Sequence, residues 1–391
     1  MTDTFRLTMA QMNPTVGDLA GNAAKAREAW RAGREAGADL VALPEMFITG
    51  YQCQDLIVKP AFVADAVRTI EALAAECADG PALAVGGPCP EGTKLHNSYY
   101  VLQGGKVAAT VHKYFLPNFN VFDEVRLFSR DQLQGPVNVN GVRIGMPICE
   151  DAWYPDVVEA LEESGAEIIV VPNGSPYFRN KQETRLNKMV ARVVESGLPL
   201  AYLNMVGGQD DQVFDGGSFV LNAHGRPAVQ MPVFDEDITT VTFRRGDEGW
   251  VADEGEFIKH PDAWEQDYRV MVESLRDYCR KTGFGKVLLG MSGGIDSALV
   301  ATIATDALGP DNVRCVMLPS EYTSKTSLED AEACANALGV RNDYVPIAEG
   351  RAAITTTLEP LFKGMAPDLT EENIQSRLRG LLLMALSNKF G

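Results

Sequence analysis

Short apolar runs alternate with amphipathic helical patterns along this chain, and this alternation is the strongest constraint on its fold. From Phe5 the order is FRLTMAQMN as a strand, NAAKAREAWRAGREAG as a helix, DLVALPE as a strand and FVADAVRTIEALAAECA as a helix. NSYYVLQGGKVAATVHK then predicts a hairpin that turns at two glycines. Apolar runs of strand length separated by helices are typical of α/β proteins. We therefore predict an α/β fold with a mixed sheet system in residues 1–245.

The segment 246–261 interrupts this pattern, because it is acidic, contains glycine and shows neither hydrophobic period. We interpret it as a linker to a second domain, residues 262–391. There KVLLGMS, VRCVMLPS and DYVPIA alternate with helical segments, which predicts a parallel sheet flanked by helices. A chain of 391 residues is also longer than a single core usually supports. The last segment is helical where a further strand is expected, so we expect the C-terminal part of this domain to be missing.

Composition narrows the possible partners and compartment. The net charge of -18 would repel nucleic acids and anionic membranes, so we expect neither as a partner. For the same reason, a phosphate site must obtain its positive potential from backbone amides or a metal ion. The seven cysteines are scattered without a CxxC pair, which argues against a zinc site or a disulfide framework. No leader-like or membrane-spanning stretch is present, so we predict a cytoplasmic protein.

Three reactive side chains follow predicted strands. Cys149 ends the strand VRIGMPI, Glu45 follows the run LVAL, and Lys113 closes the hairpin. Attack of sulfur on an amide needs a base for the thiol proton and a cation for the developing oxyanion. Taken singly, the cysteine is more often a small buried residue, and the two charges are more often solvated. The combination is what predicts amide cleavage.

The segments LPEMFITGY, HKYFLPNFNVFDE and PICEDAW resemble the three signature segments of the nitrilase (carbon-nitrogen hydrolase) superfamily. The resemblance covers about residues 5–245. It implies an αββα sandwich in which Glu45 is the general base, Lys113 stabilises the oxyanion and Cys149 is the nucleophile.

A further segment, NGSPYFRNKQETR, resembles the stretch where glutaminase members of that superfamily bind glutamine, which implies roles for Ser175 and Lys181. Tyr51 and Glu150, from the first and third signature segments, complete the candidate glutamine site. Phe119 stands where the glutaminases usually have tyrosine, and it lacks the hydroxyl group that would contact glutamine. We expect this loss to weaken glutamine binding, although a phenyl ring still offers a wall for the pocket.

In the second domain, SGGIDS lies between an apolar strand and a helix. Glycines there let backbone amides approach phosphate oxygens, and the start of the helix adds positive potential. The pattern is not a Walker A loop, and a bare glycine pair would be only a tight turn. The residues that we expect at a bound phosphate are Gly290, Met291, Ser292, Gly293, Gly294, Ile295, Asp296 and Ser297.

SGGIDS resembles the PP-loop of the ATP pyrophosphatases, which implies a Rossmann-like domain of the adenine nucleotide alpha hydrolase type with Asp296 as a Mg²⁺ contact. The segments LPSEYTSKTSLEDAEACANALG and TEENIQSRLRG resemble parts of NAD synthetases. This resemblance implies that Asn373 contacts deamido-NAD. Glu321 and Arg377 are further candidates, but the first is as readily a solvated charge and the second a helix-surface residue.

The two domains together resemble the family of glutamine-dependent NAD synthetases. That resemblance implies hydrolysis of L-glutamine, adenylylation of deamido-NAD by ATP, and attack of ammonia to give NAD, AMP and pyrophosphate. It also implies a homo-oligomer.

Three alternatives stay open from the residues alone. The chain could be an amidase or nitrilase with a non-catalytic nucleotide-binding domain. It could instead be a non-catalytic nucleotide-binding or assembly module. It could also be an amidotransferase that uses the same chemistry on another acceptor.

Overall fold

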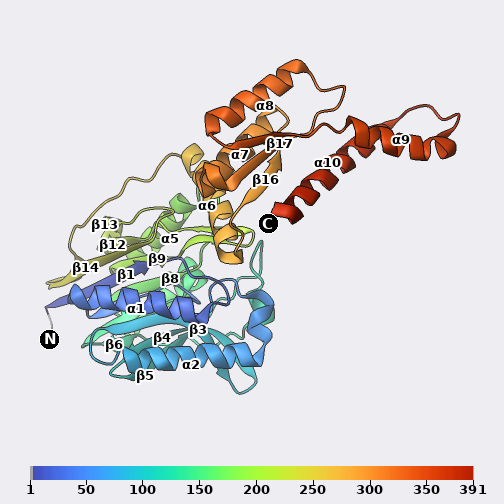
Figure 1. Cartoon of the computed structure of the whole chain (residues 1–391). Coiled ribbons are helices and arrows are strands. Elements are labelled where there is room, and N and C mark those ends of the chain that lie inside the picture. The colour runs from blue at the N-terminus through green and yellow to red at the C-terminus, as the bar shows by residue number, and fades with distance from the viewer. Residues whose placement is uncertain (1–2, 391) are drawn as a thin grey trace. The chain divides into compact units, whose positions relative to one another are not determined.

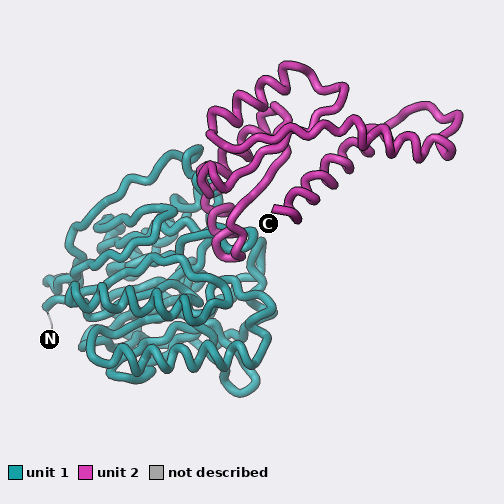
Figure 2. The backbone as a smooth tube through the Cα atoms, in the orientation of Figure 1, with its two compact units in different colours: residues 1–270 teal, residues 271–391 magenta. Residues whose placement is uncertain are grey.

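The computed structural model describes residues 3–390. The chain forms two compact units, residues 1–270 and 271–391, which Figure 2 shows in teal and magenta.

The first sheet of unit 1 has the order β15-β14-β1-β2-β3-β4-β5. Strand β1 pairs in parallel with β2 and antiparallel with β14, and β3, β4 and β5 form an antiparallel meander. The strands of this sheet are β1 (Thr4–Gln11), β2 (Leu40–Ala42), β3 (Ala82–Glu91), β4 (Lys94–Gln103), β5 (Lys106–His112), β14 (Asp237–Gly246) and β15 (Gly249–Ala252).

The second sheet has the order β13-β12-β9-β8-β7-β6, with β7, β8 and β9 parallel. A separate hairpin pairs β10 with β11. The strands are β6 (Val137–Val139), β7 (Val142–Gly145), β8 (Ile168–Asn173), β9 (Leu200–Asn204), β10 (Val206–Gln209), β11 (Gln212–Asp215), β12 (Phe219–Asn222) and β13 (Arg226–Gln230).

Helices cover the outer faces of both sheets (Figure 1). Helices α1 and α2 pack on the first sheet, and α4 and α5 pack on the second. Apolar side chains from both sheets form the core between them, so the order of layers is α, β, β, α. The fold class predicted for this domain is therefore confirmed. The helical segments of unit 1 are α1 (Leu19–Glu35), η1 (Gln54–Val58), α2 (Pro60–Glu76), α3 (Glu124–Leu127), η2 (Cys149–Trp153), α4 (Pro155–Glu163), α5 (Lys181–Ser196) and η3 (Ala223–Gly225).

Local sequence signals set the ends of these helices. The Asp18 carboxylate accepts a hydrogen bond from the backbone N–H of Gly21 at 2.8 Å and caps α1. Pro60 opens α2, where its missing N–H is not needed. Gly197 ends α5 in the left-handed conformation.

The segment 246–261, which we interpreted as a linker, includes strand β15 at the edge of the first sheet. Trp250 and Ala252 are buried there, and the Arg245 guanidinium lies 4.6 Å from the centre of the Trp250 ring. The alternation is only four residues long, which is too short to stand out among the acidic residues around it. The proposed limits of the two domains stay a prediction.

Unit 2 contains a parallel sheet of order β16-β17-β18. One apolar cluster joins this sheet to α7 and α8, and another joins β17 to α9 and α10. The predicted strand DYVPIA is shorter than expected, because β18 ends before Val345 and Pro346. The elements are α6 (Ala263–Thr282, which begins in unit 1), β16 (Val287–Gly290), α7 (Ile295–Leu308), η4 (Pro310–Asn312), β17 (Val313–Met317), α8 (Lys325–Leu338), β18 (Arg341–Tyr344), α9 (Ala348–Phe362) and α10 (Leu369–Phe390).

Within residues 3–390, no helix combines the length and apolar character needed to cross a membrane.

Candidate active site

Glu45 lies in the loop after β2 and is fully buried. Gly86 of β3 makes room for this loop, since a Cβ atom at Gly86 would lie 2.1 Å from the backbone N of Met46. The backbone N–H of Gly174 donates to Oε2 of Glu45 at 2.9 Å. The loop of Glu45 thus packs against β3 of the first sheet, and its carboxylate is bound by the loop that follows β8 of the second sheet.

Lys113 follows β5, and its ammonium group lies between two buried carboxylates. Its Nζ is 2.6 Å from Oε1 of Glu45 and 2.9 Å from Oε2 of Glu124. Burial alone would lower the pKa of Lys113, but the charges of Glu124 and Glu45 raise it well above its usual range. The ammonium group is thus a permanent cation, as stabilisation of an oxyanion requires.

The sequence predictions did not single out Glu124, although it ends the quoted segment HKYFLPNFNVFDE. The Asn97 amide donates to Glu45 at 2.8 Å and to Glu124 at 3.1 Å, and the Tyr51 hydroxyl donates to Glu124 at 2.8 Å. Burial is the main cause that raises the pKa of Glu124, while Lys113 opposes it. Glu124 and Asn97 thus position Lys113 and Glu45.

Cys149 begins the short helix η2 directly after the loop that follows β7. Its φ of 49° places a non-glycine residue in the left-handed region, a local strain that is found at functional sites. Burial, reinforced by the charge of Glu45, raises the pKa of the Cys149 thiol well above its usual range, while Lys113 acts in the opposite direction. The resting group is therefore a neutral thiol that needs a base.

Asp151 joins the loop of the cysteine to the loop of the lysine. Its carboxylate accepts hydrogen bonds from the backbone N–H groups of Ile148 at 3.0 Å, Tyr114 at 3.0 Å and Phe115 at 2.7 Å. Burial raises the pKa of Asp151 to about 7, against the effect of these donors. Asp151 thus ties its own loop to that of Phe115, which lies 36 positions earlier in the sequence.

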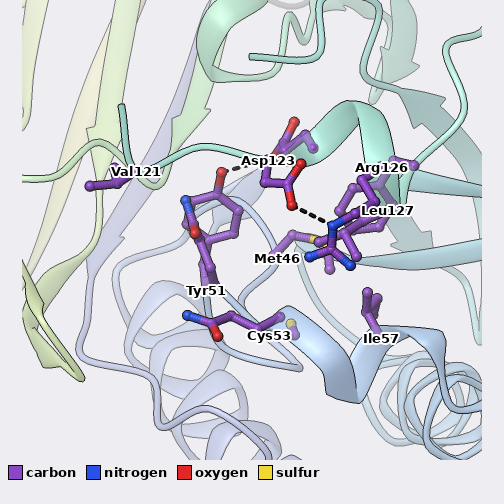
Figure 3. A pocket seen from close by; sticks show the side chains of 12 residues that line it. Met46, Tyr51, Cys53, Ile57, Val121, Asp123, Arg126 and Leu127 are labelled. Atoms are coloured by element: carbon purple, nitrogen blue, oxygen red, sulfur yellow. Dashed lines mark hydrogen bonds and ion pairs between the residues drawn. The ribbon is translucent and has the colours of Figure 1, made fainter. Parts of the chain in front are cut away.

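A cavity of about 210 Å³ adjoins this network (Figure 3). Tyr51 lies in its wall, together with Met46 and Glu124. Phe119 is 48% exposed, and its ring packs edge-on against that of Phe122 with their centres 5.7 Å apart.

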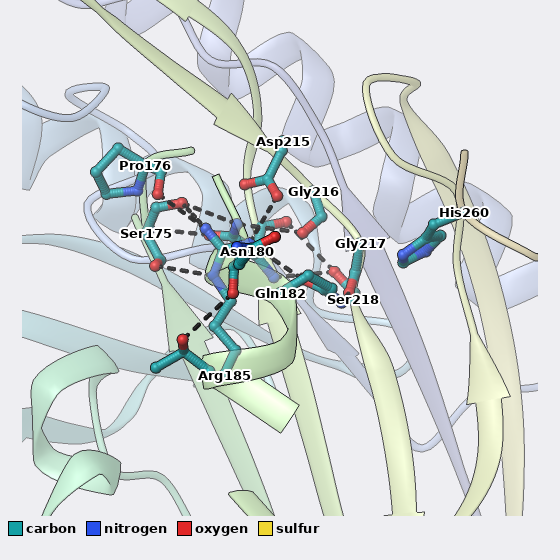
Figure 4. Close-up of polar contacts among 12 residues, drawn as sticks. Ser175, Pro176, Asn180, Gln182, Arg185, Asp215, Gly216, Gly217, Ser218 and His260 are labelled. Carbon is teal, nitrogen blue, oxygen red and sulfur yellow. Dashed lines mark hydrogen bonds and ion pairs between the residues drawn. The ribbon is translucent and has the colours of Figure 1, made fainter. Parts of the chain in front are cut away.

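Ser175 follows β8 and is held by the fully buried Arg185 of α5 (Figure 4). The guanidinium of Arg185 donates to Oγ of Ser175 at 3.1 Å, to the carbonyl of Ser175 at 2.7 Å and to that of Pro176 at 3.0 Å. An ion pair of 2.8 Å with Asp215 balances its charge. Our sequence predictions missed Arg185, because only its complete burial distinguishes it from a surface arginine on a helix.

Lys181 opens α5, and its ammonium group lies 4.3 Å from the centre of the Trp153 ring. Burial and the nearby Arg185 lower the pKa of Lys181, while Cys149 and Glu150 oppose this shift. Glu150, next to the cysteine, is itself buried, and desolvation raises its pKa. The structure therefore brings a cation and a carboxylate to the vicinity of the thiol.

In unit 2, the loop between β16 and α7 is shaped by its own side chains. The Ser297 hydroxyl donates to the carbonyl of Gly294 at 2.9 Å and accepts from the backbone N–H of Ser292 at 3.2 Å. Gly293 has a φ of +82°, and a Cβ atom there would lie 2.1 Å from the carbonyl oxygen of Ser327. Such a turn leaves a helix start open to a phosphate.

Of the other predicted residues of unit 2, Asp296 directly follows this turn. Asp296 is exposed in the first turn of α7. Asn373 and Arg377 line one cavity of about 500 Å³ beside α9 and α10. Glu321 forms an ion pair with Arg351.

Comparison with known proteins assigns each part of the chain to a family. Residues 6–251 match the carbon-nitrogen hydrolase family, and residues 267–391 match the NAD synthase family. The glutamine-dependent NAD(+) synthetase of Rhodobacter capsulatus is 58% identical over 391 residues, which are all of this chain and 71% of that protein. This chain belongs to the glutamine-dependent NAD(+) synthetase family. The enzyme of the same name from Xylella fastidiosa strain 9a5c is 43% identical, with 72% of its length covered.

Solved structures agree with this membership of the glutamine-dependent NAD(+) synthetases. The synthetase from Acinetobacter baumannii, solved with ADP, superposes with a TM-score of 0.95 at 35% identity, over 99% of this chain and 73% of that one. An amidase mutant from Nesterenkonia sp. AN1 superposes with a TM-score of 0.55 at 25% identity, over 61% of this chain and 90% of the amidase. Its active-site cysteine carries the acetamide moiety of fluoroacetamide.

Proposed function

We propose that this chain is a ligase that hydrolyses L-glutamine at Cys149 and uses the ammonia to convert deamido-NAD to NAD with ATP. The observation that carries the proposal is the buried Lys113, whose ammonium group lies between Glu45 and Glu124. Its charge is close enough to the Cys149 thiol to act on the pKa of that group. Family membership supports the same reaction.

The geometry supports the following course of hydrolysis. Glu45 takes the proton of the Cys149 thiol, and the sulfur attacks the carbonyl carbon of the glutamine side chain. Lys113 stabilises the oxyanion. The amide nitrogen takes the proton from Glu45 and leaves as ammonia, so the C–N bond breaks as a thioester forms. Glu45 then takes a proton from water, which attacks the thioester. Glu45 returns this proton to the departing sulfur, so that glutamate is released and the thiol and the carboxylate are restored.

Recognition of glutamine is assigned to the side chains around the thiol. Lys181 offers a cation to the α-carboxylate of glutamine, and Glu150 offers an anion to its ammonium group. Ser175 supplies polar atoms on a loop that Arg185 fixes. Tyr51 forms a wall and Phe119 is assigned to the entrance.

Unit 2 supplies the ATP-dependent half of the proposal. The residues 290–297 surround the phosphates, and Asn373 contacts deamido-NAD. The exposed carboxylate of Asp296, at the turn of this loop, is a hard oxygen donor of the kind that Mg²⁺ takes. A bound Mg²⁺ would neutralise phosphate charge during adenylylation. We place the enzyme in the cytoplasm, a reducing compartment in which cysteines stay unpaired.

The test is formation of NAD from deamido-NAD and ATP, measured with glutamine and, separately, with ammonium as the nitrogen donor. We expect Cys149→Ala to abolish the glutamine reaction and to keep the ammonium reaction. Cys334→Ala, in unit 2, is the matched control and should keep both.

Two outcomes would oppose the proposal. Glutamine hydrolysis that survives in Cys149→Ala would remove the cysteine from its role. Ammonia release without any NAD from either donor would favour an amidase with a nucleotide-binding domain.

A further inference from the structure

A second cluster of reactive side chains lies on the opposite face of the first sheet from Asn97. Cys89 and Glu91 are on β3, His96 on β4 and His112 on β5. Cys89 pairs directly with His96, and His112 pairs with Ser98, in the antiparallel ladders. Because side chains alternate along a strand, positions two apart share a face, and the four groups therefore gather on one side of the sheet.

The ligand atoms of three of these residues are already close. The sulfur of Cys89, a carboxylate oxygen of Glu91 and a ring nitrogen of His112 lie within 4.8 Å of one another. Nε2 of His112 is 3.3 Å from Glu91 and 4.0 Å from Asp131. Nδ1 of His112 is 2.7 Å from the Ser98 hydroxyl, a bond that fixes the ring and leaves Nε2 facing the carboxylates.

His96 gives an independent sign that a ligand is missing. Its side chain is 1% exposed, yet neither ring nitrogen finds a hydrogen-bond partner within residues 3–390. A buried polar group without a partner calls for an explanation, such as a bound ion. The His96 ring centre lies 4.5 Å from that of His112. Two imidazoles on one tetrahedral zinc ion have ring centres roughly 5 Å apart.

We propose that Cys89, Glu91, His96 and His112 form a site for a divalent transition-metal ion, with Zn²⁺ as the best match. One thiolate, two imidazoles and one carboxylate suit zinc, whereas Mg²⁺ and Ca²⁺ prefer oxygen ligands alone. Ligand atoms around zinc are roughly 3–4 Å apart, so the ligand atoms of Cys89, Glu91 and His112 must move inward by about 1 Å. His96 lies outside this group of three, and its ring must turn toward them to complete the site. Glu91 can make this movement, because its side chain is 57% exposed.

The site has a structural consequence for the nearby chemistry. His112 directly precedes Lys113 at the end of β5. An ion bound here would tie the ends of β3, β4 and β5 together and so brace the position of the lysine. Since the ligands come from three strands, their spacing in the sequence does not resemble a zinc motif.

The test is titration of the full chain with Co²⁺, an optical probe for zinc sites, in a Cys149→Ala background that removes the catalytic thiol as a ligand. We expect one Co²⁺ per chain, with a thiolate-to-cobalt band in the near ultraviolet that added Zn²⁺ abolishes. Cys89→Ser should remove that band and weaken binding at least about 100-fold. Cys334→Ser, which alters a half-buried thiol in unit 2, should change neither.

Glu91→Gln is a second test that stays valid even if Cys89→Ser misfolds, because the exposed side chain of Glu91 contributes little to folding. We expect Co²⁺ binding to weaken about tenfold while circular dichroism stays unchanged. Absence of a stoichiometric Co²⁺ complex in the parent, or a thiolate band that persists in Cys89→Ser, would overturn the proposal.

Discussion

Three buried charges lie at the centre of the proposed glutaminase site. Lys113 is shared by Glu45 and Glu124, and Asn97 donates to both carboxylates. A buried ion pair is stable only if its remaining polar atoms are also satisfied. The second carboxylate therefore helps to keep Lys113 protonated, so that the ammonium group does not pass its proton to the general base Glu45.

Replacing Glu124 by Gln should lower kcat for glutamine hydrolysis by about 10²-fold or more, because Lys113 loses one of its two anchors and shifts from the oxyanion position. KM should change little, since Glu124 positions the lysine and does not bind glutamine. Ammonia release under saturating glutamine measures the effect. Asp123→Asn, an exposed neighbour paired with Arg126, is the control. Equal losses in both variants would contradict this role.

Alkylation of Cys149 by iodoacetamide should accelerate with pH through pH 9 without a plateau. The raised pKa means that the thiol stays protonated at neutral pH, and only the thiolate reacts quickly. Peptide mass spectrometry at a series of pH values follows this cysteine alone. A plateau below pH 8 would reveal a preformed thiolate and would contradict the need for Glu45 as a base.

The sequence motifs predicted Glu45, Lys113 and Cys149 as site residues, because a carboxylate, an ammonium group and a thiol are the groups that amide cleavage needs. The role of Glu124 depends on its burial, which a segment rich in charged and aromatic residues does not reveal. Asn97 was hidden for a similar reason, since only the pairing of β3, β4 and β5 places its amide between two carboxylates.

At the scale of elements, Arg185 couples α5 to the loop after β8. Arg185→Met should lower the free energy of unfolding of unit 1 by about 3–5 kcal/mol, because Asp215 would remain as a buried unpaired charge. The Ser175 loop should also lose its support, which raises the KM for glutamine. Arg226→Met removes an exposed pair with Glu254 and should cost less than about 1 kcal/mol. Chemical denaturation compares the two, and similar costs would contradict this account.

The turn between β16 and α7 offers a second test at this scale. Gly293→Ala should weaken ATP binding by at least about tenfold, because the new methyl group would clash with the carbonyl of Ser327 and distort the turn. Gly285→Ala, in the loop before β16, has open space around it and is the control. Isothermal titration with ATP distinguishes them. Unchanged affinity in Gly293→Ala would show that the shape of this turn does not matter.

Most elements were predictable, because apolar periodicity was clear in the strands and helices that build the cores. The sequence did not predict β15, because its four residues lie in an acidic segment. The strand predicted at β18 extended too far, because the apolar run VPIA continues after the strand ends. In both cases the limits depend on pairing with a neighbouring strand, which the local pattern does not encode.

For the whole molecule, residues 6–251 match the carbon-nitrogen hydrolase family and residues 267–391 match the NAD synthase family, and the glutamine-dependent NAD(+) synthetase family combines both parts in one chain. The predicted family and fold class are confirmed. The roles of individual residues and the homo-oligomeric state stay predictions. The central claim is that the sulfur of Cys149 forms a covalent bond with glutamine.

Intact-mass spectrometry of the enzyme quenched in acid during turnover of glutamine tests this claim most directly. We predict a species heavier by the mass of glutamine minus ammonia, located on the peptide that contains Cys149, and its absence from Cys149→Ala. Steady ammonia release without such an adduct, or an adduct on another residue, would contradict the account.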